Sequence, residues 1–391
     1  MKYNAADLHC LTPDSFELPA TGSGVLDGLS FVLKDMIAIE GHISSFGSSR
    51  WRETHTESKS SSPILTRLLN AGARMAGLAT LDQLAGSLYG FLGEGKQPLN
   101  PLYNDCIPGG SSSGSASAVA GGIADFAIGT DTGGSVRVPS ACCGVYGIRP
   151  SHGNITSEGV LPWAPSFDVV GIMARDAQIL QRVYQVLASS PDSAPKITKL
   201  LVVRDIFPLV SAETANALVA FTQQLAAARN LSVEEIVSRE LIAEDIVLLI
   251  WQIMSREIWR ENGTWIKANR QYLIEDFRRR TMLSEHIYEA STSEWIQEDN
   301  DKRAEFRELV NSLLDPGTAL IIPTLQHLPP KLHAKFDRSN PFWQVTFLLN
   351  SISGLSGVPQ VVVPIQNQGA TWGIGIISAA NSDARLLELI N

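Results

Sequence analysis

Residues 108–150 read PGGSSSGSASAVAGGIADFAIGTDTGGSVRVPSACCGVYGIRP. Two Gly-Gly-Ser clusters, at 109–111 and 133–135, flank a helix-like segment of small residues at 113–122 and a short apolar, strand-like segment at 125–128. Glycine-rich turns let the backbone approach another group closely. Successive N–H groups in such turns form concave sites that bind anions. The stretch therefore predicts a site built partly from backbone N–H groups.

The charge and composition of the 391-residue chain exclude several partners. Acidic side chains outnumber basic ones by 40 to 31 and no basic block stands out, so we expect neither nucleic acid nor a membrane surface as a partner. The four cysteines form no C-x-x-C pair, and we expect no metal and no cofactor. No signal peptide core or membrane-spanning apolar run occurs, so we expect a cytoplasmic protein.

Apolar runs and helix-like segments alternate along most of the chain. Residues 61–72 carry the signals of a helix, because Ser62 can cap it, Pro63 suits its first turn and Gly72 ends it. Similar signals predict strands at 29–33, 74–79, 197–203, 319–323, 360–365 and 373–378, and helices at 81–88, 176–189 and 382–390. Strands separated by helices predict an α/β fold, with a mixed, largely parallel central sheet covered by helices on both faces.

Residues 211–314 differ in character from the rest of the chain. The segment is more charged, shows helical spacing of apolar residues and carries four of the eight tryptophans. Because strands are expected again after it, we interpret it as a helix-rich layer or cap within one domain. The predicted organisation of this single domain, residues 1–391, is a lead-in at 1–28, a catalytic core at 29–190, the helix-rich layer at 211–314 and a return to the core sheet at 315–391.

A serine nucleophile needs a base, and His152 is one candidate. It lies close after the Gly-Ser stretch, in which Ser112 occupies the serine position of a G-x-S-x-G pattern at residues 110–114. That pattern requires a strand directly before the serine turn. Residues 104–110 contain a proline and two glycines with little apolar content. An esterase that uses Ser112 and His152 is therefore the weaker alternative.

Lys34 is the second candidate base. A lysine accepts a proton only when it is neutral, which requires burial or nearby positive charge. Lys34 follows the apolar run 31–33 and precedes Met36 and Ile37. A lone lysine at a strand end is usually exposed, but the paired Gly-Gly-Ser turns downstream favour the catalytic interpretation.

Seven motifs resemble those of the amidase signature family. They are VLKD at 32–35, PGGSSSGSA at 108–116, GTDTGGSVRVP at 129–139, CGVYGIRP at 143–150, SFDVVG at 166–171, LIIPT at 320–324 and SGLSGVP at 353–359. The resemblance runs from about residue 25 to the end of the sequence, and its central motif is long and specific. It implies the amidase signature fold and the hydrolysis of an amide bond.

The resemblance also implies a catalytic triad of Lys34, Ser111 and Ser135, with a cis peptide between Gly110 and Ser111. In this arrangement Lys34 takes the proton of Ser111, Ser111 takes that of Ser135, and Ser135 attacks the amide carbonyl. The leaving amine is protonated through the same groups, and water then cleaves the acyl-enzyme. No histidine is required.

Neighbouring residues have supporting roles in the implied site. Backbone N–H groups of the second turn bind the developing oxyanion, and they belong to Thr132, Gly133, Gly134 and Ser135. Asp131 and Arg137 hold the loop, and Ser112 hydrogen-bonds Lys34 or its own turn. Ser113 stands where many members have glycine, a departure that leaves the proton relay intact.

Within the family, the sequence most resembles plant indole-3-acetamide hydrolases, at residues 110–115, 149–153 and 262–266. This implies a small aryl-acetamide as substrate and an apolar pocket whose aromatic walls come from Trp163 or from the tryptophan-rich layer at 211–314. The expected partner is a small-molecule amide, with the chain acting as a monomer or homodimer. Three alternatives remain open: the glutaminase subunit of a tRNA-dependent amidotransferase, an amidase for other small or fatty amides, and an inactive binding protein.

Overall fold

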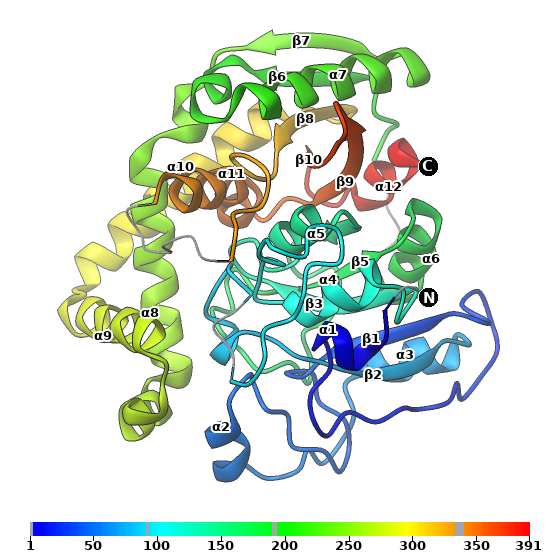
Figure 1. Cartoon of the computed structure of the whole chain (residues 1–391). Helices are drawn as coiled ribbons and strands as arrows, with labels where there is room; N and C mark the ends of the chain where they lie inside the picture. The colour runs from blue at the N-terminus through cyan, green and yellow to red at the C-terminus, as the bar shows by residue number, and fades with distance from the viewer. Residues whose placement is uncertain (1–2, 91–93, 190–193, 333–339) are drawn as a thin grey trace.

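A ten-stranded β-sheet runs through the part of the chain that the computed structural model describes, residues 3–90, 94–189, 194–332 and 340–391 (Figure 1). In spatial order its strands are β2 (Arg74–Ala79), β1 (Ser30–Lys34), β3 (Phe126–Asp131), β5 (Val169–Ala174), β4 (Tyr146–Arg149), β9 (Gln360–Asn367), β10 (Ala370–Ser378), β8 (Thr318–Pro323), β6 (Lys199–Val203) and β7 (Ser232–Ile236). The sheet joins distant parts of the sequence, because β4 pairs directly with β9.

The strand directions divide the sheet into three parts. Parallel pairs link β2, β1 and β3 at one end and β8, β6 and β7 at the other. The strands between them, from β3 through β5, β4, β9 and β10 to β8, pair antiparallel. The predicted mixed sheet with helices around it is confirmed. The sheet contains more antiparallel strand pairing than the sequence suggests.

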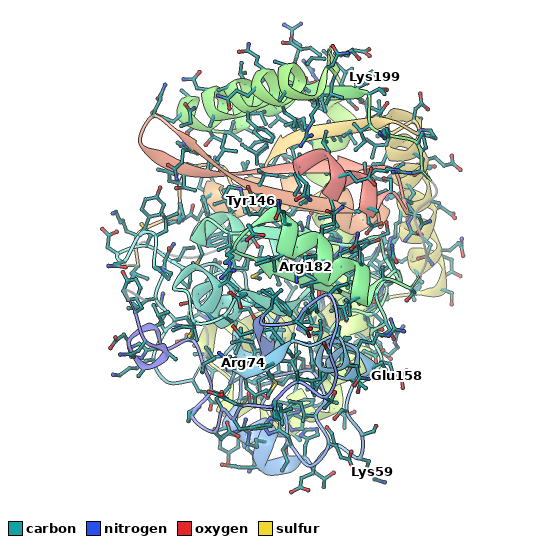
Figure 2. The ribbon with its side chains drawn as sticks, turned by 90° about the vertical axis from the view of Figure 1, so that its right-hand side faces the viewer. Lys59, Arg74, Tyr146, Glu158, Arg182 and Lys199 are labelled. Atoms are coloured by element: carbon teal, nitrogen blue, oxygen red, sulfur yellow. The ribbon has the colours of Figure 1, made fainter. Side chains whose placement is uncertain are left out.

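Helices cover both faces of this sheet (Figure 1). On one face α4 and α5 pack against β3 and β4, and on the other α6 and α12 pack against β5 and β9. Figure 2 looks onto the side that carries α6, where Lys59, Arg74 and Glu158 are exposed. The helices of the described residues are α1 (Ala5–Leu8), α2 (Ser49–Thr54), α3 (Pro63–Asn70), α4 (Ser113–Ala120), α5 (Arg137–Cys143), α6 (Ala177–Leu187), α7 (Ala212–Arg229), α8 (Glu244–Asn269), α9 (Glu275–Ala290), α10 (Ser293–Leu313), α11 (Pro341–Ser356) and α12 (Asp383–Ile390).

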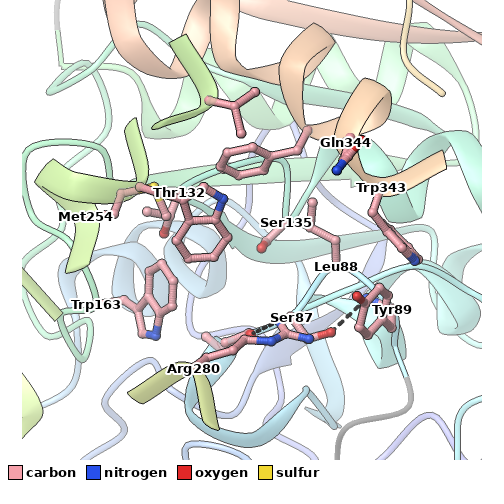
Figure 3. A pocket seen from close by; sticks show the side chains of 16 residues that line it. Ser87, Leu88, Tyr89, Thr132, Ser135, Trp163, Met254, Arg280, Trp343 and Gln344 are labelled. Carbon is pink, nitrogen blue, oxygen red and sulfur yellow. Dashed lines mark hydrogen bonds between the residues drawn. The ribbon is translucent and has the colours of Figure 1, made fainter. Parts of the chain in front are cut away.

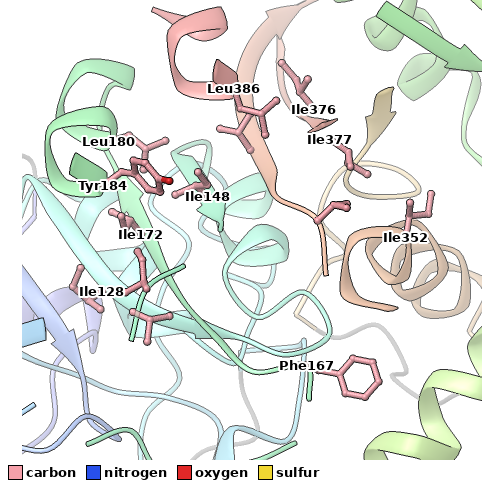
Figure 4. Packing of buried hydrophobic residues seen from close by; sticks show 14 of the residues in the cluster. Ile128, Ile148, Phe167, Ile172, Leu180, Tyr184, Ile352, Ile376, Ile377 and Leu386 are labelled. Carbon is pink, nitrogen blue, oxygen red and sulfur yellow. The ribbon is translucent and has the colours of Figure 1, made fainter. Parts of the chain in front are cut away.

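Three adjacent strands form the centre of the hydrophobic core (Figure 4). Ile128 of β3, Ile172 of β5 and Ile148 of β4 lie side by side in register, and all three are fully buried. Leu180 and Tyr184 of α6 cover them. Burial of a side chain of this size contributes about 1.5–3 kcal/mol. This packing fixes the strands from which the site loops emerge.

In the helix-rich segment 211–314, α8, α9 and α10 lie to one side of the sheet, and α7 and β7 lie at its end, next to β6 (Figure 1). The long helix α8 packs against α9, α10 and α11. The segment also contains β7, which the sequence does not predict and which extends the sheet next to β6. Among the described helices, none combines the length and hydropathy needed to cross a membrane.

The predicted helix at 81–88 is wrong. The structure has only a 3₁₀ turn there, Gln83–Ala85, in which Leu84 and Ala85 adopt left-handed conformations with φ of 48° and 52°. An α-helix does not allow these angles. The N–H of Leu84 instead donates to the carbonyl of Phe46 at 2.7 Å, so a contact from a distant loop overrides the local helical preference.

Candidate active site

The two Gly-Gly-Ser turns are joined through their backbones. The peptide between Gly110 and Ser111 is cis, as the family resemblance implies. The N–H of Ser112 donates to the carbonyl of Ser135 at 3.2 Å, and the N–H of Asp82 donates to the carbonyl of Ser111 at 3.2 Å. The first hydrogen bond holds the turn that carries Ser111 against the turn that carries Ser135, and the second fastens the Ser111 turn to the loop at Asp82.

Lys34 lies at the end of β1 and is fully buried. Its Nζ is 2.8 Å from the Oγ of Ser111, so the fold brings together two residues that the sequence alone does not place near each other. Burial lowers the pKa of Lys34 to about 7, although the carboxylates of Asp82, Asp131 and Asp168 raise it by attraction. An amine with this pKa is available as a proton acceptor near neutral pH.

The loop after β3 presents backbone N–H groups around Ser135. Within the described residues, the N–H groups of Thr132, Gly133 and Ser135 have no intramolecular acceptor. The N–H of Gly134 differs, because it donates to the Oδ1 of Asp131 at 2.9 Å. Of the four N–H groups predicted as oxyanion donors, that of Gly134 thus already has an acceptor, and those of Thr132, Gly133 and Ser135 remain the candidates.

Asp131 is a fully buried carboxylate that holds this loop in place. Besides Gly134, it accepts hydrogen bonds from the backbone N–H groups of Val136 and Arg137, at 3.0 and 3.2 Å. The guanidinium of Arg137 contacts both of its oxygens, at 2.7 and 3.0 Å, and Arg149 contacts Oδ1 at 3.1 Å. Burial alone would raise the pKa of Asp131, but the two arginines hold it well below its usual range. Asp131 therefore stays charged.

Arg137 extends this network to the carboxyl-terminal part of the chain. Its Nη1 donates to the carbonyl of Asn350 at 2.7 Å and to the Oγ of Ser353 at 2.9 Å, both on α11. The same nitrogen donates to the Oε1 of Gln360 on β9 at 2.7 Å. The predicted pairing of Asp131 with Arg137 is present, and it links the loop to α11 and β9.

Ser112 and His152 do not form a catalytic pair. The Oγ of Ser112 is buried and contacts the backbone carbonyl and N–H of Thr130, at 3.3 and 3.4 Å. The Nε2 of His152 lies 3.0 Å from the carbonyl of Pro165. The esterase alternative therefore loses its support. Within the described residues, no three His, Cys, Asp or Glu side chains are grouped as a metal site.

A cavity of about 240 Å³ lies in front of Ser135 (Figure 3). Thr132 and Gly133, which carry two of the three acceptor-free N–H groups, line it together with Ser135. Its walls are mostly apolar and aromatic, and include Leu88, Tyr89, Trp163, Val247, Trp251, Met254, Trp343 and Phe347. Trp163, predicted as a substrate-binding residue, therefore lines the cavity. Part of the wall comes from α8, which lies in the tryptophan-rich layer, and part from α11, which the sequence did not single out.

Asp168 is a site residue that the sequence analysis missed. Its Oδ1 accepts a hydrogen bond from the Oγ1 of Thr132 at 2.5 Å, and its Oδ2 accepts from the N–H groups of Trp163 and Ala164 at 2.8 and 3.0 Å. Burial raises its pKa. Asp168 thus connects the loop that carries Ser135 to the cavity wall. Asp168 could have been identified from the sequence, because it lies in the SFDVVG motif at 166–171.

Comparison with known proteins identifies the family of the chain. The sequence matches the amidase family over residues 14–387. The chain belongs to the amidase signature family. Amidase 1 of Oryza sativa subsp. japonica is 33% identical over 97% of this chain and 91% of its own length. Amidase 1 of Arabidopsis thaliana is also 33% identical, over 94% of this chain and 92% of its own length.

The amidase fold is shared with a solved structure. A crystal structure of an amidase superposes with a TM-score of 0.81 at 25% sequence identity, and the match covers 94% of this chain and 84% of the other. The family resemblance drawn from the motifs is therefore confirmed. The protein described by the present sequence is therefore a hydrolase of amide bonds that acts on small amide substrates.

The buried charge network generates a stability prediction. Asp131→Asn leaves Arg137 and Arg149 buried without their counter-charge, so we expect it to lower the free energy of unfolding by about 3–5 kcal/mol. Chemical denaturation at neutral pH measures the loss. The control is Glu275→Gln, which removes the partner of Arg279 in an exposed pair and should cost less than about 1 kcal/mol. Equal stability of the two variants would contradict the role given to Asp131.

Proposed function

We propose that this amidase hydrolyses a small aryl-acetamide-type primary amide, such as indole-3-acetamide, to a carboxylic acid and ammonia. The observation that carries the proposal is the cavity in front of Ser135, which combines acceptor-free N–H groups near Ser135 with walls that are mostly apolar and aromatic, Ser87, Arg280 and Gln344 being among the polar residues. The amide carbonyl fits the first environment and an aryl group fits the second.

In the proposed acylation step, Lys34, Ser111 and Ser135 act as a relay. Neutral Lys34 accepts the hydroxyl proton of Ser111, Ser111 accepts that of Ser135, and the Oγ of Ser135 forms a bond to the amide carbon. The oxyanion that develops accepts hydrogen bonds from N–H groups of the loop 132–135. Donors of this kind are each worth about 3 kcal/mol of barrier when aimed at the developing charge.

In the second half of the reaction, the proton held on Lys34 returns through Ser111 to the leaving nitrogen. The carbon–nitrogen bond breaks, ammonia departs, and the acyl group remains on Ser135. Water then attacks the acyl-enzyme while the same relay takes its proton, and the carboxylic acid is released with Ser135 restored. The balance of protons requires only these three side chains and one water molecule.

The shape of the cavity supports a small acyl group. Its volume of about 240 Å³ falls below the roughly 300–1,000 Å³ of pockets that hold drug-sized ligands. The rings of Trp251 and Phe347 stack at 5.3 Å in one wall, and such flat apolar surfaces suit an aromatic ring. A long fatty chain exceeds this space. The polar side chains of the lining, Ser87, Arg280 and Gln344, are few beside the apolar and aromatic ones, which favours an aryl group over the charged backbone groups of glutamine.

Substitutions in the relay test the mechanism. We expect Ser135→Ala to abolish ammonia release and Lys34→Ala to lower kcat by about 10²- to 10⁴-fold, the usual worth of a positioned base. Lys302→Ala, at an exposed lysine on α10, is the matched control and should keep full activity. Thermal unfolding of each variant confirms that it is folded. If Lys34→Ala releases ammonia at the wild-type rate, the proposed relay is wrong.

The pKa of Lys34 predicts the pH dependence of the rate. Because the neutral amine is the active form and its pKa is about 7, kcat should fall about tenfold for each pH unit below 7. Below pH 7 the lysine is protonated in both the folded and the unfolded chain, so this group adds no further loss of stability there. It makes the free energy of unfolding rise with pH between about 7 and 10.5. A rate that stays flat down to pH 5, with the fold intact by circular dichroism, would contradict the assignment.

A panel of amides tests the substrate class. We expect indole-3-acetamide and phenylacetamide to show kcat/KM values at least about tenfold above those of glutamine, malonamide and a long-chain fatty amide. Ammonia release is the measurement, and Ser135→Ala is the blank. A preference for glutamine would instead favour the glutaminase alternative, and a preference for the fatty amide would favour a lipid-directed amidase.

A further inference from the structure

Lys34 has a second hydrogen-bond partner besides Ser111. Its Nζ lies 2.8 Å from the Oγ1 of Thr130 on β3. The same hydroxyl lies 3.3 Å from the Sδ of Met36, to which it donates. All three side chains are buried, with exposed fractions of 0% for Lys34, 6% for Thr130 and 2% for Met36. Solvent therefore does not compete for these contacts.

The number of hydrogens decides the direction of these contacts. A threonine hydroxyl has one hydrogen, and a thioether sulfur can only accept it. With its hydrogen on Met36, the hydroxyl of Thr130 can only accept from Lys34. A neutral amine has two hydrogens and one lone pair. One hydrogen is then directed at Thr130, and the lone pair is free to face the hydroxyl of Ser111 at 2.8 Å.

We propose that Thr130, oriented by Met36, is a positioning residue that aims the lone pair of Lys34 at the hydroxyl proton of Ser111. This role rests on the proposed function, in which Lys34 is the base. Met36 sets the direction, because without the sulfur the hydroxyl of Thr130 can turn its hydrogen toward Lys34. In that orientation it competes with Ser111 for the only lone pair.

The backbone of Thr130 is held where this role requires it. The Oγ of Ser112 lies between its carbonyl and its N–H, at 3.3 and 3.4 Å. Ser112, which the resemblance places near the lysine, therefore acts on Thr130 and fastens β3 to the first turn. The charged groups that face Lys34 are the carboxylates of Asp82, Asp131 and Asp168, which attract its protonated form without orienting its lone pair.

Three variants test the proposal with a fluorophosphonate probe, which labels an activated serine whatever the natural amide is. Thr130→Val keeps the shape of the side chain and removes the hydroxyl, so the rate of labelling of Ser135 should fall about tenfold or more. The fall of the labelling rate on the acid side of its pH profile (the acid limb) should move to lower pH in Thr130→Val, because the protonated form of Lys34 loses a hydrogen-bond acceptor. Thr130→Ser should restore both values. Met36→Leu should label severalfold more slowly than the wild type.

The matched control is Thr222→Val. Thr222 is equally buried, and its hydroxyl donates to the carbonyl of Leu218 within α7. It should lose some thermal stability while keeping the wild-type labelling rate and acid limb. A merely structural role for Thr130 would give the same pattern in Thr130→Val.

The outcomes separate the positioning role from the base assignment. If Lys34→Ala does not label while Thr130→Val labels with the wild-type rate and acid limb, the positioning role is overturned and the base stands. If Lys34→Ala labels normally, the base assignment fails and the positioning role fails with it. Should Thr130→Val not fold, Met36→Leu decides, because a wild-type labelling rate in that variant overturns the direction set by the sulfur.

Discussion

A buried carboxylate with no access to water governs the geometry of this site. Moving the charge of Asp131 out of water is costly, and the structure offsets that cost with two arginines and three backbone N–H groups. The N–H groups belong to the nucleophile loop itself, so the carboxylate dictates the path of that loop. One arginine reaches on to α11 and β9, so the position of Ser135 depends on contacts made by the far end of the chain.

Lys34 poses the opposite problem, and the site solves it differently. Its hydrogen-bond partners are hydroxyl groups, and the surrounding carboxylates raise its pKa by less than burial lowers it. Burial is therefore what leaves the amine of Lys34 partly uncharged near neutral pH.

Local signals in the sequence predicted much of the sheet. The strand expected at 74–79 matches β2 residue for residue, because an apolar run there lies between a helix-ending glycine and a polar turn. Helix α5 and strand β7 were missed, since the first is built from small and β-branched residues with an internal proline and the second is mostly exposed. The helix expected at 81–88 failed because a hydrogen bond to Phe46 fixes Leu84 in a left-handed conformation.

The site shows the same division between local and long-range information. Lys34, Ser111 and Ser135 stand in long motifs, and the family resemblance placed them together. Thr130 stands in the motif at 129–139 and Met36 directly follows the motif at 32–35, but neither motif reveals their contact, which joins residues 94 positions apart. The occupied N–H of Gly134 was equally hidden, since only the folded loop reveals which donors already have an acceptor.

The cavity has walls of two origins. The groups of the proposed proton relay come from β1 and the two Gly-Gly-Ser turns, whereas much of the aromatic enclosure comes from α8 and α11. Substitutions on those helices can reshape the space for the acyl group without touching Lys34 or Ser111. Substrate range and chemical step are therefore separately mutable in this fold, and a lineage of such enzymes can acquire new amides while inheriting one unchanged catalytic apparatus.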